Sequence, residues 1–271
     1  IMAYIEPSEF VTKMVDAGEQ KVYMSTKDTI IRAFMAGAIL GLAAIFAITV
    51  ATKTGSPILG ACLFPVGFIM LYLMKFDLLT GVFTLVPLAL FDKRPGVTFG
   101  GVMRNWGLVF VGNFAGAMTT AFFMSFILTY GYSADGGAIA AKVASIGESR
   151  TLGYQEHGIG GWLTIFIRGM LCNWMVSMGV VGAMISTSAG AKMAAMWMPV
   201  MLFFFMGFEH SIVNMFLFPF SMIMGGDFTV YDYLLWNEIP TVLGNLAGGL
   251  LLVGLPLYLT HVRTSPERKI S

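Results

Sequence analysis

A Glu-His pair, Glu209-His210, lies inside one of the most apolar stretches of the chain, residues 203–214. An ionisable side chain in hydrocarbon costs about 2.5–3.5 kcal/mol even on the lenient membrane-insertion scales. A histidine at that depth is therefore expected to face a cavity or a polar partner rather than lipid. Pro199 and Gly207 precede the pair, so the helix can break there. A broken helix that carries a titratable ring is typical of a solute pathway through a membrane.

The composition also indicates a membrane protein. The chain is 57% hydrophobic and 11% charged, whereas soluble domains have about 25% charged residues. Its repeated apolar runs of about 20 residues are long enough to cross a bilayer. The formal net charge of +1 argues against a nucleic-acid partner. The two cysteines lie in apolar segments and the three histidines are widely separated, so no disulfide framework, metal site or cofactor is expected.

We predict an all-α protein with six membrane-spanning segments, of which the second and the fifth are broken. One channel domain covers 29–262, after an amphipathic helix within 1–28 and before a tail at 263–271. The first helix either lies on the membrane face or packs on the bundle. The expected spans are Ile30–Val50, Ile58–Phe91 (broken at Lys75–Gly81), Val102–Thr129, Trp162–Ser186, Met193–Phe220 (broken at Gly207–Ser211) and Pro240–Thr260, with loops at Gly131–Gly161 and Gly225–Glu238.

The distribution of lysine and arginine predicts the orientation. An even number of spans puts both ends of the chain on one side of the membrane, and most of the cations fall on that side. Only Lys53, Lys142, Arg150 and Arg168 fall on the other side in this arrangement. Cytoplasmic loops carry the excess of positive residues. Both termini are therefore expected in the cytoplasm, in a multi-pass protein of a bacterial-type inner (plasma) membrane.

The two halves of the chain, about 29–130 and about 160–262, resemble each other. The sequence Val111–Gly116 recurs as Leu243–Gly248 at an offset of 132 (112 to 244), and Gly37 matches Gly169 at the same offset. Because each half has three predicted spans, the second half would insert upside down and form an inverted repeat. The glycines spaced by four within these segments are interpreted as close contacts between helices.

The two predicted breaks also correspond. Thr80 in the first break aligns with His210 in the second at an offset of 130 (80 to 210). Equivalent positions near the axis of an inverted repeat approach each other in mid-membrane. We therefore predict that the side chains of Thr80 and His210 lie close together.

Four motifs occur along the chain: Asp77–Gly81 (DLLTG), Leu171–Trp174 (LCNW), Gly207–Ser211 (GFEHS) followed by Asn214-Met215, and Val242–Asn245 (VLGN). In this order and spacing they resemble the formate/nitrite transporter family, over nearly the whole chain. The resemblance implies an aquaporin-like protomer of two inverted three-helix repeats, assembled as a homopentamer. It also implies one pore per protomer for small monovalent anions such as formate, nitrite, hydrosulfide, acetate or lactate. Of these weak-acid anions we expect formate, with nitrite or hydrosulfide as the alternative.

The resemblance implies roles for individual residues. His210 matches the central pore histidine and Thr80 the threonine opposite it. For Glu209 the residues themselves leave three roles open: it neutralises His210, caps a half-helix or, as we expect, has a structural hydrogen-bonding role. The remaining matches are the polar positions around the histidine (Asn173, Asn214 and Asn245), the apolar constrictions (Phe64, Phe68, Leu78, Leu79 and Phe203) and the vestibule positions (Arg168 and His157).

Two positions depart from the family pattern. His157 stands where some members have a vestibule lysine. Lys75 stands where the family usually has a small apolar residue. Its long side chain is expected to reach the membrane face or to pair with Asp77, rather than to bind substrate.

An anion that enters a dry pore loses its hydration, at an idealised cost of about 20 kcal/mol that falls to several kcal/mol after relaxation. His210 can offset this cost with positive charge or with a proton, because its reference pKa of about 6.5 lies close to neutral pH. Transport coupled to protons is therefore one expectation.

Two other classes of function were compared with anion transport. A neutral-solute channel of the aquaporin type would have an Asn-Pro-Ala motif at both breaks, and the chain has none. An intramembrane enzyme would use Glu209, His210 and the adjacent Ser211, but sequence neighbours rarely form a nucleophile–base pair without further partners. We therefore do not expect an enzyme.

Overall fold

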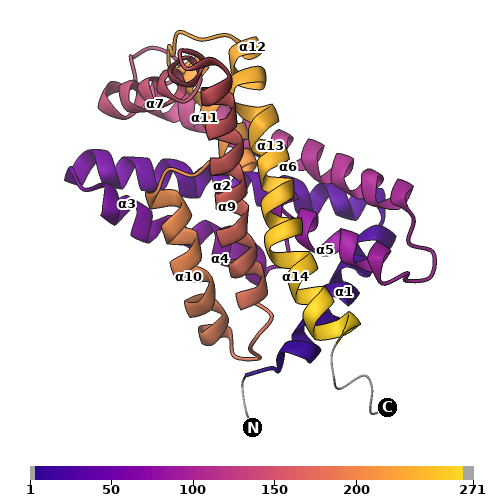
Figure 1. The fold of residues 1–271 in the computed structure, drawn as a ribbon. Coiled ribbons are helices and arrows are strands. Elements are labelled where there is room, and N and C mark those ends of the chain that lie inside the picture. The colour runs from indigo at the N-terminus through magenta and orange to yellow at the C-terminus, as the bar shows by residue number, and fades with distance from the viewer. Residues whose placement is uncertain (1–3, 265–271) are drawn as a thin grey trace.

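The computed structural model describes residues 4–264, which are helical apart from short connections (Figure 1). No β-sheet occurs in this part of the chain. In chain order its helices are α1 (Pro7–Tyr23), α2 (Thr26–Thr54), α3 (Pro57–Leu63), α4 (Pro65–Leu73), α5 (Leu79–Phe91), α6 (Phe99–Leu128), α7 (Gly137–Ser149), α8 (Leu152–Gln155), α9 (Gly158–Gly182), α10 (Ala189–Phe205), α11 (Ser211–Ile223), α12 (Val230–Tyr233), η1 (Leu234–Glu238), α13 (Ile239–Gly249), η2 (Leu250–Gly254), α14 (Leu255–Tyr258) and η3 (Leu259–Arg263), the η segments being π-helical turns.

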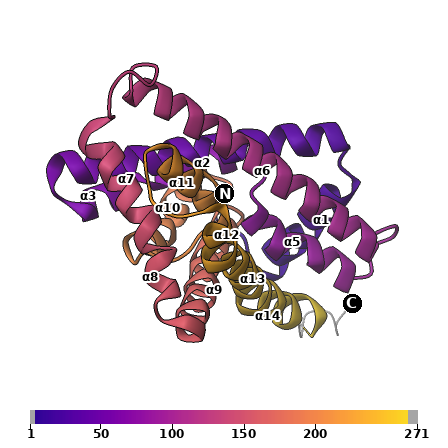
Figure 2. The same cartoon turned by 90° about the horizontal axis from the view of Figure 1, so that it is seen from above.

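Four of the helices among the described residues are long and apolar enough to cross a membrane: α2, α6, α9 and the continuous helix Val230–Arg263. The shorter apolar helices form two consecutive pairs, Pro57–Leu73 with Leu79–Phe91 and Ala189–Phe205 with Ser211–Ile223. The predicted all-helical membrane fold is confirmed, and the two interrupted apolar segments lie where the sequence indicated. The long helices pack as two close pairs, α2 with α6 and α9 with α13 (Figure 2).

The interruptions fall at residues 74–78 and 206–210. In each, the chain leaves the helix through a residue with positive φ, Lys75 at 57° and Gly207 at 65°. The next residue then donates its N–H back into the preceding helix, from Phe76 to Leu71 O at 2.9 Å and from Phe208 to Phe203 O at 3.0 Å. These are the hydrogen bonds of a left-handed helix C-cap.

The first break is shorter than the sequence suggested. Thr80 was expected within it, but lies in the first turn of α5. Leu78 and His210 are the N-cap residues of α5 and α11, so the counterpart of His210 is Leu78 at an offset of 132 (78 to 210). The predicted repeat match between Thr80 and His210, at an offset of 130, was therefore wrong. It did not take into account the residue at which each half-helix begins.

The repeated glycines lie where helix backbones touch. A Cβ atom on Gly116 of α6 would lie 1.9 Å from Phe34 O of α2, and one on Gly248 of α13 would lie 2.0 Å from Met170 O of α9. The offset between Phe34 and Met170 is 136 rather than 132. The match of Gly37 with Gly169 was therefore wrong by one helical turn, since a single offset does not hold across a connection of different length.

Two expected loops contain helices. Gly131–Gly161 includes α7 and α8, and α7 buries Ala140, Val143 and Gly147 against the rest of the fold. Gly225–Glu238 includes α12 and η1, which continue directly into α13. The glycine-rich and acidic composition of the two stretches as a whole hid these short helices, although the α7 segment itself contains four alanines, the best helix formers.

Helix α1 packs on the bundle, which decides between the two interpretations of the N-terminal segment. It buries the side chains of Phe10, Val11, Met14, Val15 and Val22, and contacts α5, α6 and η3. Figure 1 shows α1 at one end of the molecule and α7 at the other. Because α1 contacts η3, both ends of the described chain lie together.

The substitution Gly116→Ala should force α2 and α6 apart, because its methyl group has no room. We expect a loss of about 1–3 kcal/mol in the free energy of unfolding, as for other overpacked sites. Gly107→Ala on the same helix is the matched control, since its methyl group would meet nothing within 4 Å. The measurement is thermal unfolding in detergent, followed by size-exclusion chromatography. Equal midpoints for the two variants would contradict the close contact.

Candidate functional site

His210 begins the second half-helix of the second broken segment. Its Nδ1 accepts hydrogen bonds from the N–H groups of Ile212 at 3.2 Å and Val213 at 3.4 Å, so the ring is the side-chain N-cap of α11. An Nδ1 that accepts two N–H groups carries no proton, and the neutral ring therefore carries its proton on Nε2.

The protonated nitrogen of this ring faces Thr80. Nε2 of His210 lies 3.4 Å from Thr80 Oγ1, and both residues are at most 1% exposed. The predicted proximity of the two side chains is therefore present. Helices α5 and α11 both begin here, and helix N-termini favour negative charge. The contact thus combines two polar donors with two helix N-termini.

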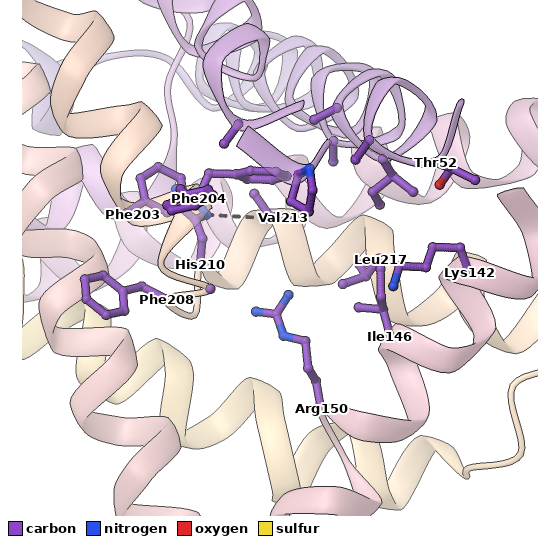
Figure 3. A pocket seen from close by; sticks show the side chains of 18 of the residues that line it. Thr52, Lys142, Ile146, Arg150, Phe203, Phe204, Phe208, His210, Val213 and Leu217 are labelled. Carbon is purple, nitrogen blue, oxygen red and sulfur yellow. Dashed lines mark hydrogen bonds between the residues drawn. The ribbon is translucent and has the colours of Figure 1, made fainter. Parts of the chain in front are cut away.

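A cavity of about 550 Å³ opens from this contact toward α7. We call it the α7-side cavity. Its inner end is formed by His210 and Phe203, whose rings are stacked with centroids 5.4 Å apart. Figure 3 shows Lys142 and Arg150 reaching toward the cavity from the α7 region, and Phe204 next to His210. The remaining lining residues are mostly apolar.

A second cavity, of about 260 Å³, lies toward α1. We call it the α1-side cavity. It is bounded at its inner end by Leu78, the residue before the half-helix that holds Thr80. Cations are concentrated in its lining, which includes Lys21, Arg32, Lys75, Lys192 and the carboxylate Asp77. His210 thus lines the α7-side cavity, whereas Leu78 and Gly81, on either side of Thr80 in the chain, line the α1-side cavity.

The five residues expected at constrictions are all at most 2% exposed. Phe203 lines the α7-side cavity and Leu78 lines the α1-side cavity, so each lies at an inner end. Phe64 supports Phe203 edge-on, with centroids 5.6 Å apart. The others are not lining residues: Phe68 packs against Tyr72 at 4.6 Å, and Leu79 donates its N–H to Asn113.

Glu209 pairs with Arg150 and not with His210. Arg150 Nε donates to Oε1 at 2.9 Å and its Nη2 to Oε2 at 2.5 Å. Tyr154, Asn214 and Asn237 donate three further hydrogen bonds to the same carboxylate, which is fully buried. Of the three roles considered, the geometry is that of a structural ion pair.

Sequence reasoning missed the role of Arg150, which had entered only the count of cations. The sequence does carry a signal for this role. Gly147 stands three residues before Arg150, and Gly18 stands three residues before Lys21, so the two cations follow a glycine at the same spacing. Lys21 pairs with Asp77, which precedes Leu78 as Glu209 precedes His210. The backbone carbonyls of the two cations accept from equivalent amides, Asn105 at 3.1 Å and Asn237 at 2.9 Å.

The three predicted pore asparagines are occupied by protein partners. Asn245 Nδ2 donates to Gly169 O at 2.8 Å and to Glu209 O at 2.9 Å. Asn173 Nδ2 donates to Thr80 O at 3.1 Å and to Asn245 O at 2.6 Å, and Asn214 donates to Glu209. None of the three is among the residues that line the two cavities. Asn173 and Asn245 contact the backbone around the ring, whereas Asn214 contacts the side chains of Glu209 and Asn237.

The predicted vestibule residues lie further out. Arg168 donates to the hydroxyl of Tyr154 at 2.7 Å, and His157 is exposed at the start of α9. Neither residue lines the α7-side or the α1-side cavity. Burial, followed by the charge of Glu209, raises the pKa of Tyr154 to about 12. The neutral phenol therefore links Arg168 to Glu209.

The protein is a helical membrane protein in which two broken apolar segments meet at a buried polar contact. One cavity lies on the α7 side of the fold and another on the α1 side. This arrangement is that of a transport protein rather than of an enzyme. The family model described as formate/nitrite transporter matches residues 8–259. The chain belongs to the formate/nitrite transporter family.

Individual relatives agree with this assignment. The chain is 32% identical to a probable formate transporter of Methanothermobacter thermautotrophicus over 248 residues, covering 86% of this chain and 89% of the relative. It is 30% identical to formate channel FocA of Escherichia coli (strain K12) over 276 residues, covering 91% and 92%. A solved structure of a pentameric formate channel with formate bound has the same fold, with a TM-score of 0.72 at 24% identity, covering 86% of this chain and 96% of that one.

Removal of Arg150 should destabilise the protein, because it leaves the carboxylate of Glu209 buried without a counter-charge. We expect Arg150→Ala to lower the free energy of unfolding by about 3–5 kcal/mol, the usual cost of removing one partner of a buried pair. Lys142→Ala, in the same cavity, is the control and should change stability little. The double variant Arg150→Ala/Glu209→Gln should recover part of the loss. A melting temperature of Arg150→Ala equal to that of the control would contradict the structural pair.

Proposed function

We propose that the protein carries formate across the membrane through a pathway that joins the two cavities at His210. The observation that supports this most is the contact between His210 Nε2 and Thr80 Oγ1, which lies buried between two cation-lined cavities. The relatives described above as formate channels and transporters support the choice of formate. Nitrite and hydrosulfide are the alternative anions.

The chemistry of the pathway follows from its groups. A small anion enters a cavity where lysine and arginine side chains raise its local concentration. It then passes between Phe203 and Leu78, where water is excluded and its lost hydration must be replaced. The Nε2–H group of His210 and the hydroxyl of Thr80 donate hydrogen bonds to the anion there. The N-termini of α5 and α11 add a favourable potential.

The hydrogen bonds of His210 bear on proton transfer. Protonation of Nδ1 would convert the N-cap acceptor into a donor that faces two N–H groups of α11. The neutral ring is therefore favoured over the imidazolium while the cap is intact. We propose that His210 acts on the passing anion first as a hydrogen-bond donor. Transport together with a proton requires the cap to open.

The proposal includes the arrangement in the membrane. Each broken segment would count as one crossing, which makes six crossings in two inverted repeats, and both termini would lie in the cytoplasm. The contact between α1 and η3 supports a shared side for the two ends. We further propose a homopentamer, which the shared fold with the solved pentameric formate channel supports. Native mass spectrometry in detergent would test it against five copies of the 29.4 kDa chain.

Proteoliposomes that contain the purified protein should take up formate faster than nitrite or hydrosulfide. The assay compares isotope or sensor signals for the three anions and records the internal pH at the same time. Movement of formate with a current and without a pH change indicates an anion channel, whereas acidification in step with uptake indicates proton coupling. Passage of water or glycerol but of none of the three anions would contradict the proposal.

The substitution His210→Asn separates the two roles of the ring. Asparagine is a good N-cap, so this variant should fold with a stability within about 1 kcal/mol of the unsubstituted protein. Its shorter side chain removes the Nε2–H group from Thr80. Formate flux should therefore fall at least tenfold, which corresponds to a rise of about 1.4 kcal/mol or more in the free-energy barrier to transport. His210→Phe should lose both the cap and the flux. Unchanged flux and pH dependence in His210→Asn would contradict the role of His210.

A further inference from the structure

We propose that the α1-side cavity is a binding site for a doubly charged oxyanion, of the class that sulfate and hydrogen phosphate represent, and that this anion competes with the transported one. The binding stands on the structure alone, whereas the competition rests on the proposed function. Sulfate is the probe of choice, because its charge does not change near neutral pH.

The charges that line the cavity are unbalanced. Lys21 is paired with Asp77, the one carboxylate among the lining residues. Arg32, Lys75 and Lys192 also line it, and no ion pair to any of the three occurs among residues 4–264. Three positive charges therefore remain without a counter-charge in a cavity of about 260 Å³.

The α7-side cavity lacks this excess. Its cations are Lys142 and Arg150, and Arg150 is neutralised by Glu209. One unpaired cation thus remains in the larger cavity and three in the smaller one. The difference arises in part at the breaks, where Lys75 takes the place that Gly207 has in the second half.

The position of Lys75 adds an independent argument. Its φ of 57° is in the left-handed region, which glycine adopts freely and other residues rarely adopt. Gly207 adopts almost the same φ of 65° at the equivalent point. A lysine is therefore held in a glycine-like conformation at a place where its side chain lines an anion-accessible cavity. Lys93 has a similar φ of 56° but lines neither cavity, so the argument for Lys75 depends on the place of its side chain in the cavity lining.

A doubly charged anion fits this site better than the monovalent substrate. One monovalent anion would leave two of the three positive charges unbalanced, and Coulomb attraction rises in proportion to the charge of the ligand. The volume suits a small oxyanion with several waters at about 30 Å³ each, and is below the about 300–1,000 Å³ of sites for drug-sized ligands. The dianion cannot proceed past Leu78, because its desolvation is far more costly than that of a monovalent ion. It therefore occupies the cavity without being carried.

Binding is tested with two lysine variants that share a backbone conformation. Lys75→Gly removes a cavity cation, and Lys93→Gly is the matched control, because Lys93 has a φ of 56° and does not line either cavity. Thermal unfolding in detergent is measured in sodium sulfate and in sodium chloride at equal ionic strength. Sulfate stabilises most proteins by exclusion from their surface, and this general effect is the same for both variants.

We expect sulfate to raise the melting temperature of Lys93→Gly more than that of Lys75→Gly. The concentration of sulfate at half effect should rise at least about threefold in Lys75→Gly, because the loss of one unit charge at about 7 Å from a dianion weakens binding about sevenfold in water and screening by salt reduces this factor. Lys192→Gln should reproduce the effect from a second element. Equal sulfate responses in Lys75→Gly, Lys192→Gln and Lys93→Gly would overturn the site.

Competition is tested by formate uptake into vesicles of known sidedness. Sulfate at about twice the concentration of half effect found in the melting experiment should raise the half-saturation for formate about threefold from the face that carries α1, by competitive mass action. It should have no such effect from the other face, and Lys75→Gly should lose the inhibition while Lys142→Gln keeps it. Equal inhibition from both faces would overturn the competition. If formate does not pass at all, the proposed function fails while the melting experiment still decides the site.

The oxyanion can come from solution or from an anionic lipid headgroup. The melting experiment is therefore repeated with zwitterionic phosphatidylcholine and with phosphatidic acid added to the detergent. The quantity compared is the difference between Lys75→Gly and Lys93→Gly in the rise of melting temperature that sulfate causes. If this difference disappears only when phosphatidic acid is present, the lipid headgroup is the occupant. A difference that persists identifies the soluble ion.

Discussion

The structure depends on one constraint, which is that backbone polar groups exposed by a broken helix must find partners in an environment without water. Two asparagines meet it in the same way. Asn113 donates to Asp77 O at 2.9 Å and accepts from Leu79 N at 2.9 Å, and Asn245 donates to Glu209 O at 2.9 Å and accepts from Ser211 N at 3.0 Å. Each amide thus connects a long helix to both sides of a break. The half-helices can begin in the middle of the protein because these four hydrogen bonds replace those of a continuous helix.

The acidic residues at the breaks follow from the same constraint. Asp77 and Glu209 each lie one residue before the N-cap of a half-helix, and each is neutralised by a cation from outside the apolar helices, Lys21 or Arg150. Removal of either cation would leave a buried carboxylate, which is far more costly than the pair itself. Helices α1 and α7 therefore act as supports of the two breaks from opposite ends. The negative charge next to the proposed pathway is thereby cancelled, and the helix N-termini and His210 would act on a passing anion without it.

The two halves share this scaffold but differ in the side chains that the proposed pathway would use. Where the second half has His210, the first half has Leu78, and where the second has Gly207, the first has Lys75. The polar ring therefore comes from one half only, with Thr80 of the other half completing the contact. The excess of unpaired cations lies at the α1 end. The repeated fold therefore contains an asymmetric site. Packing restrains the backbone in both halves, whereas the side chains that line the cavities can differ between them.

The sequence by itself determined the class of fold and the positions of the two breaks within a few residues, because apolar periodicity and intramembrane charges are strong local signals. The proximity of Thr80 and His210 was predicted from a repeat match in which the structure puts Leu78 in the place of Thr80. The sequence could not determine which groups pair. Glu209 pairs with Arg150, which is 59 residues away in the chain. The side-chain amide of Asn245 donates its hydrogen bonds to backbone carbonyls and does not line either cavity. Sequence reasoning also missed α7, which lies inside a glycine-rich stretch and packs against α11. Which cations remain unpaired was decided only by the tertiary structure, because the partner of a charge is set by distance in space and not along the chain.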